Sequence, residues 1–153
     1  MNWDDQKSLK LSVACVWVFF LLLAALDIGC YWLVEWFLSI PRVTLGHGLR
    51  EGLLLMSSLY LCSLPAWTLL LNLYGLLGSI GKGHVFTAQN VARLRRVSWC
   101  CIAVCVVCLA SALYYLPWLL GGAAAGFMAL IVRIVKNCFE QALRMKDELD
   151  FTI

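Results

Sequence analysis

Four long apolar runs dominate this sequence and constrain its fold more than any other feature. They cover residues 11–38, 53–77, 97–116 and 119–135. A helix needs about 20 mainly apolar residues to cross a bilayer, and within lipid a helix satisfies every backbone hydrogen bond inside its own segment. The runs therefore predict an all-α integral membrane protein with four transmembrane helices.

The composition agrees with this prediction. Hydrophobic residues make up 63% of the 153-residue chain and charged residues only 14%, whereas soluble domains contain about 45–50% apolar residues. A chain of this length fits one domain. We expect a single antiparallel four-helix bundle over residues 1–153, with a tight hairpin at Pro117 and a cytoplasmic helical tail at 136–153.

The distribution of lysine and arginine predicts the orientation. Ten of the 12 basic residues lie in the N-terminal segment, the second connection and the C-terminal segment, and the first connection holds Arg42 and Arg50. Basic residues concentrate on the cytoplasmic side of membrane proteins. We therefore expect both termini in the cytoplasm of a multi-pass protein of the cell membrane. The charge is interpreted as contact with anionic headgroups of the lipid bilayer, with no direct nucleic acid binding.

Asp27 is the most costly residue to place in lipid, since a carboxylate near a helix centre costs about 2.5–3.5 kcal/mol on insertion scales. It lies about 24 Å from Leu11 at the rise of a helix, in the outer part of the bilayer core. The hydroxyl groups expected at this depth belong to Ser57, Ser58, Ser111, Tyr114 and Tyr115, and Arg42, His47 or Arg50 could reach Asp27 from the first connection. This polar cluster is either an outward-facing ligand, ion or proton site or a hydrogen-bonded tie between helices. The tie is favoured, because a transport path usually needs several ionisable groups at depth.

Cysteine and glycine residues lie at helical spacing in the third and fourth runs. Cys101, Cys105 and Cys108 share one helix face; three thiols could bind a soft metal, but a stripe of small side chains for close packing is the favoured interpretation. Gly122 and Gly126 form a small-residue motif that suits contact either within the bundle or between subunits of a homo-oligomer. We expect no metal, cofactor or disulfide framework.

The histidines argue against an enzyme. His47 and His84 lie in connections that the predicted topology puts on opposite sides of the membrane. No Ser/His/Asp or Cys/His arrangement is available within one compartment, and no phosphate-binding loop is present. We therefore expect no enzymatic activity.

Two cytoplasmic segments carry most of the distinctive polar sequence. In residues 83–96, Thr87 is expected to cap a helix by accepting a hydrogen bond from the amide of Asn90, with Phe86 and Leu94 at the bilayer boundary and the arginines reaching toward headgroups. The acidic tail ends the chain. The segments are either a docking surface for a cytoplasmic partner or plain solvated structure, and the residues expected to dock a partner are Phe86, Thr87, Asn90, Leu94, Glu148, Asp150 and Thr152.

These two segments also carry a family resemblance. Residues 83–96 are similar to the Gly-x-x-Phe-…-Asn-x-x-x-Leu segment of bacterial membrane proteins in the domain-of-unknown-function family 2975, and residues 148–153 resemble that family's acidic terminus. Phe151 and Leu149 depart from the residues usual there. Such proteins are often encoded beside a small helix-turn-helix regulator of the Xre type, so the resemblance implies such a regulator as a partner but no biochemical activity.

Two functions follow as hypotheses. The first is a non-enzymatic regulatory or signalling component that acts with a cytoplasmic helix-turn-helix regulator. The alternative is a small transporter or channel subunit with an outward-facing polar site at Asp27.

Overall fold

The structure, a computed structural model, describes residues 3–39, 49–83 and 85–150 of the chain and contains four helices there. They are α1 (Trp3–Leu38), α2 (Leu49–Gly81), α3 (Ala88–Ser111) and α4 (Trp118–Asp150). The described residues include no strand. All four helices are long and apolar enough to cross a membrane. The predicted all-α class and the four candidate spans are therefore confirmed.

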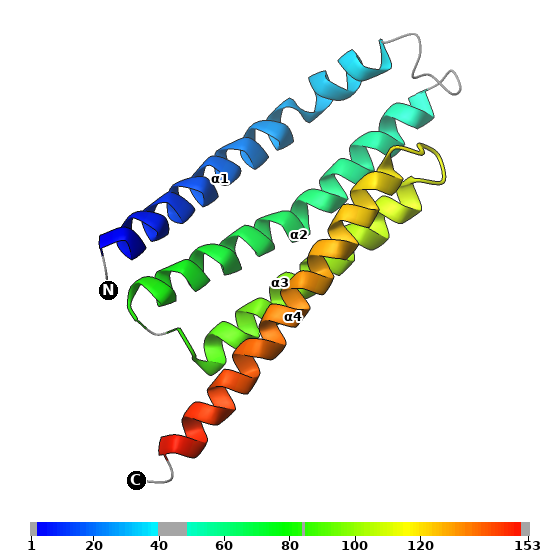
Figure 1. Cartoon of the computed structure of the whole chain (residues 1–153). Helices are drawn as coiled ribbons and strands as arrows, with labels where there is room; N and C mark the ends of the chain where they lie inside the picture. Colours follow the sequence, from blue (N-terminus) through cyan, green and yellow to red (C-terminus); the bar gives the residue numbers. More distant parts are fainter. Residues whose placement is uncertain (1–2, 40–48, 84, 151–153) are drawn as a thin grey trace.

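Each helix packs against the next one along the chain. The helix pairs whose backbones lie close together within the described residues are α1 with α2, α2 with α3, and α3 with α4. Figure 1 shows the chain reversing direction at each of the three connections. The helices α1 and α4 therefore stand at the two edges of this arrangement, and each has a broad face that no other described helix covers.

The buried core is small, and large apolar side chains are exposed along every helix. One buried cluster joins Cys30 and Val34 of α1 to Leu55 of α2. A second joins Val97 and Cys101 of α3 to Ala129 of α4. Exposed apolar surface on this scale would be unstable in water. In a bilayer it faces lipid tails, which are as apolar as the side chains themselves.

Small residues bring α3 and α4 close together. A Cβ added at Gly122 would lie 3.1 Å from Leu109, and one added at Gly126 would lie 3.3 Å from the sulfur of Cys105. Ser98 donates a hydrogen bond across the same interface to the carbonyl of Ala129 at 3.3 Å. The sequence left open which surface the glycines contact; the structure packs both against α3 of the same chain.

The connections follow local sequence signals. Thr87 has an extended backbone, with φ −134° and ψ 148°, and its side chain accepts a hydrogen bond from the Asn90 amide, so the predicted cap is confirmed. Gly83 has φ +79°, a conformation that favours glycine. The helix α3 ends at Ser111, five residues earlier than the predicted 116. Pro117 disfavours helical conformation only at Leu116, so it accounts for the last of these residues and not for the others.

Candidate functional site

Asp27 is tied to α2 by two hydrogen bonds. The indole Nε1 of Trp67 donates to the Asp27 carboxylate oxygen Oδ2 at 2.8 Å. The hydroxyl of Tyr60 donates to the Asp27 backbone carbonyl at 3.2 Å. An indole N–H is a donor only, so it matches a carboxylate acceptor. This contact is the interhelical tie that the sequence favoured, but Trp67 was not among the expected donors.

The packing of α1 against α2 explains the different partner. At one end of the interface Leu38 lies against Gly52, and at the other Leu9 lies against Gly81. Asp27 lies 11 residues before Leu38 and 18 residues after Leu9. Because the two helices run in opposite directions, the same numbers of residues counted along α2 from Gly52 and back from Gly81 both lead to Ser63, which therefore lies opposite Asp27. Depth estimated from the starts of the apolar runs had placed it opposite 57 and 58, about 8 Å away at the rise of a helix.

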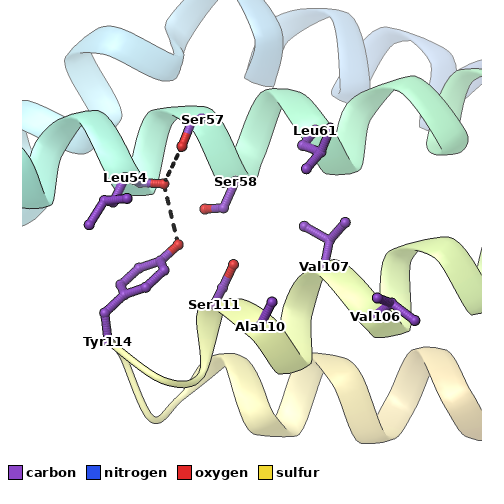
Figure 2. A pocket seen from close by; sticks show the side chains of 9 residues that line it. All are labelled: Leu54, Ser57, Ser58, Leu61, Val106, Val107, Ala110, Ser111 and Tyr114. Carbon is purple, nitrogen blue, oxygen red and sulfur yellow. Dashed lines mark hydrogen bonds between the residues drawn. The ribbon is translucent and has the colours of Figure 1, made fainter.

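The expected hydroxyl groups lie instead between α2 and α3, at the end of α3 that precedes the Pro117 turn. Ser57, Ser58, Ser111 and Tyr114 line one pocket of about 480 Å³ between these helices. In Figure 2 the Leu54 carbonyl accepts hydrogen bonds from Ser57 at 2.9 Å and from Tyr114 at 3.3 Å. Ser58 and Ser111 are buried and point into the space between the helices.

This pocket has the features of an apolar ligand site with a few polar groups. Leu61, Val106, Val107 and Ala110 form most of its wall. Tyr115 is not among its lining residues, although its amide joins the same turn by donating to the Ser111 carbonyl at 3.1 Å. The polar groups in the pocket are neutral hydroxyls, so the arrangement suits a largely apolar molecule better than an ion.

Asp27 lines a separate pocket of about 230 Å³ that is formed mainly by α1 and α2, with Val104 of α3. Cys30, Cys62 and Ser63 are its other polar lining residues, and the rest of the wall is aliphatic. Within the described residues, no group of three or more His, Cys, Asp or Glu side chains could hold a metal ion. The other groups expected to reach Asp27 are Arg42, His47 and the side chain of Arg50, and they lie outside the described residues.

A polar network joins the C-terminal end of α2 to the start of α3. The Arg93 guanidinium donates to the Gly75 carbonyl at 2.5 Å and to the Ser79 hydroxyl at 2.6 Å. It also donates to the side-chain oxygen of Asn90 at 3.4 Å, and Asn90 itself donates to the Val85 carbonyl at 2.9 Å. Asn90 is fully buried, with 0% exposure. We call these four contacts the α2–α3 elbow.

The basic residues around Arg93 predict that its side chain reaches toward lipid headgroups. The structure turns it onto α2 instead, because Gly75 has no side chain in the path of the guanidinium. Glycine and serine four residues apart at Gly75 and Ser79 were the signal that could have indicated this contact, since they leave room and an acceptor on one helix face.

The residues expected to dock a partner divide into two groups. Asn90 and Leu94 are buried, and Thr87 is engaged in capping, so these three hold the elbow together. Phe86 packs on Phe139 of α4 with ring centroids 5.3 Å apart. Glu148 is exposed and has an interaction of its own. The side chain of Asp150 and all of Thr152 lie outside the described residues.

The last part of α4 extends beyond the Phe86–Phe139 contact as a continuous helix to Asp150, which Figure 1 shows reaching past the start of α3. Lys136 and Arg144 both pair with Glu140 here, at 2.6 and 3.8 Å. We name the segment 140–150 the α4 extension. Its exposed residues Met145 and Leu149 are four positions apart and therefore share one face.

Comparison with known proteins identifies a family without an assigned activity. No curated protein and no solved structure matches the chain. One family model, described as Protein of unknown function (DUF2975), matches residues 10–153, nearly the whole chain. The four-helix architecture and this match agree with the resemblance seen in the sequence. The chain therefore belongs to the DUF2975 family.

Proposed function

We propose that this protein is a non-enzymatic membrane component that holds a cytoplasmic regulator, in keeping with the helix-turn-helix partner implied by its family. In this proposal the four helices cross the cell membrane as an antiparallel bundle with both termini in the cytoplasm. The uneven distribution of basic residues supports that orientation. The α4 extension then stands in the cytoplasm, where a regulator would meet it.

The exposed apolar face of the α4 extension is the observation that carries this proposal. Met145 and Leu149 are 59% and 68% exposed. If Lys136 marks the bilayer boundary, Met145 lies about 13 Å and Leu149 about 20 Å beyond it along the helix. The headgroup region adds only about 5–7 Å per side. These side chains therefore project past the headgroups into water, where a partner would stabilise them by covering them.

The α2–α3 elbow gives the α4 extension a fixed base. Arg93 joins α3 to the end of α2, and Phe86 joins the α2–α3 connection to α4 at Phe139. A change in the packing of α2 would therefore reach the α4 extension through contacts between side chains. This arrangement suits a protein that holds or releases a regulator when the membrane part changes.

Co-purification with a small helix-turn-helix regulator of the Xre type, the partner that the family resemblance implies, tests the proposal. The double variant Met145→Gln/Leu149→Gln should weaken capture of that regulator by at least tenfold. Arg144→Gln is the matched control, because Arg144 lies on another side of the same helix and is 76% exposed at its side chain. Both variants should retain wild-type helicity by circular dichroism. Equal capture by the double variant and the control would refute docking on this face.

The orientation has its own test. Reporter fusions in the first connection, at His47, should report the outside of the cell, and fusions in the second, at His84, should report the cytoplasm. The opposite pattern would put the α4 extension outside the cell and would overturn the proposal.

The pocket beside Asp27 favours a second candidate, a small transporter or channel subunit. Its carboxylate lies among aliphatic side chains, where an ionisable group commonly marks an ion or substrate path. Flux of protons or sodium ions into liposomes containing the protein should then be lost in Asp27→Asn, which keeps an acceptor for Trp67. Unchanged flux in this variant, or no flux through the unmodified protein, would eliminate the candidate.

A further inference from the structure

A basic pocket lies between α3 and α4, away from both pockets described above. It has a volume of about 190 Å³ and is lined by Arg95, Ser98, Trp99 and Ile102 of α3 and by Arg133 and Lys136 of α4. Three of its six lining residues are cationic. The other two pockets are lined mainly by apolar side chains, so this one differs from them in chemistry.

The pocket lies at the depth of lipid headgroups. Arg133 follows the start of α4 at Trp118 by about 22 Å along the helix, and Arg95 precedes the end of α3 at Ser111 by about 24 Å. A bilayer core is about 30 Å thick, so both guanidinium groups can reach the boundary opposite the Pro117 turn. Trp99 is 66% exposed beside them, as expected of an indole ring at a membrane interface.

The charges of the pocket are only partly neutralised by the protein. Lys136 pairs with Glu140 at 2.6 Å and donates to the Asn137 side chain at 3.1 Å. Among the residues that the structure describes, Arg95 and Arg133 form no ion pair. Two guanidinium groups thus face a small pocket with one carboxylate near its edge, which leaves a net positive site for an anion.

We propose that this pocket binds the phosphate group of an anionic phospholipid in the cytoplasmic leaflet. The planar guanidinium groups of Arg95 and Arg133 match the paired oxygens of a phosphate. The exposed Trp99 and the half-buried Ile102 line the same pocket and follow Arg95 along α3 toward the bilayer core, where their apolar surfaces suit the start of an acyl chain. A phosphate attached to a lipid is therefore favoured over a free one. The proposal rests on the membrane orientation proposed above but not on the regulatory function.

Binding of defined lipids to the full-length purified chain tests this inference. We expect tighter binding of phosphatidylglycerol and cardiolipin than of phosphatidylcholine in detergent, measured by native mass spectrometry or by thermophoresis. Each cation near an anionic membrane contributes about fivefold to binding. The double variant Arg95→Gln/Arg133→Gln should therefore bind phosphatidylglycerol about 25-fold more weakly.

The control removes the same charge elsewhere on the cytoplasmic side. Lys82→Gln/Arg96→Gln changes two exposed cations that do not line the pocket. Circular dichroism should show native helicity in both double variants. If both lose the same affinity, the lipid responds to overall charge and the pocket proposal is overturned. Competition by water-soluble glycerol phosphate at lipid-equivalent concentrations would overturn the choice of a lipid ligand.

Discussion

The contact between Arg93 and Gly75 can be tested by filling the space that the glycine leaves open. A Cβ at position 75 would lie 3.1 Å from the Arg93 Cζ atom and 3.2 Å from its Nε atom. Valine there would force the guanidinium away from the Gly75 carbonyl and the Ser79 hydroxyl, which it contacts at 2.5 and 2.6 Å. Gly75→Val should therefore disconnect α3 from the C-terminal end of α2.

The expected loss follows from the two hydrogen bonds. Bonds to a charged donor contribute about 1.5–3 kcal/mol each in soluble proteins. Interhelical bonds within membranes average about 0.6 kcal/mol and reach about 1.7, because the unfolded chain also finds partners there. Arg93 joins two membrane helices and is only half-buried, so the lower values apply. We expect a total loss of about 1–3 kcal/mol in the free energy of unfolding.

Gly78→Val is the matched control, since a Cβ at Gly78 would meet no atom within 4 Å. Both substitutions change helix propensity equally, so their difference measures the displaced arginine. The assay is reversible unfolding in mixed detergent micelles, followed by circular dichroism. In an Arg93→Met background the difference between the two glycine variants should disappear. Equal losses for Gly75→Val and Gly78→Val in the unmodified protein would refute the contact. If the losses of Gly75→Val and Arg93→Met add in the protein that carries both, Gly75 acts independently of Arg93.

Three further predictions use the same unfolding assay. Trp67→Phe removes the indole donor and should lower the free energy of unfolding by about 1 kcal/mol. Asp27→Asn keeps an acceptor oxygen and should lower it by less. The reverse order would mean that the carboxylate charge, and not the hydrogen bond to Trp67, stabilises the pair of helices. Asn90→Ala should cost about 2–3 kcal/mol, because it leaves buried polar groups without partners; wild-type stability would contradict the burial of Asn90. Gly126→Val should lower the free energy of unfolding by about 1–3 kcal/mol through overpacking against α3. Gly121→Val should lower it by less, because a Cβ there would lie 3.7 Å from the sulfur of Cys108. Equal losses would contradict the close packing of α3 and α4.

Local signals in the sequence were sufficient to predict the four helices and the cap at Thr87. The apolar runs predicted four helices, because a helix in lipid is decided by hydropathy over its own length. Thr87 was recognised as a cap because its partner, the Asn90 amide, is three residues away. Each of these features depends on neighbours along the chain, so no knowledge of the other helices was needed.

Contacts between helices could not be predicted in the same way. The expected donors to Asp27 came from counting depth along each run separately, which missed the offset between α1 and α2 by more than one turn. Arg93 was expected at the headgroups because its sequence neighbours are basic, whereas a glycine on another helix decides its position. Ser57, Ser58 and Ser111 were expected beside Asp27. They line one pocket together, because they lie four or five residues from the ends of the apolar runs 53–77 and 97–116, but Asp27 lies in a different pocket.

The sequence by itself therefore determined how many helices form and that each is long and apolar enough to cross a membrane, because hydropathy and helix capping act within a segment. Only the tertiary structure decided which side chains meet: Asp27 with Trp67, Arg93 with the end of α2, and Gly126 with Cys105. Lipid tails and apolar side chains are nearly equivalent surroundings for a transmembrane helix, so hydropathy does not select the helix register. Close approach at small residues and hydrogen bonds between helices do, and both arise only when two helices are side by side.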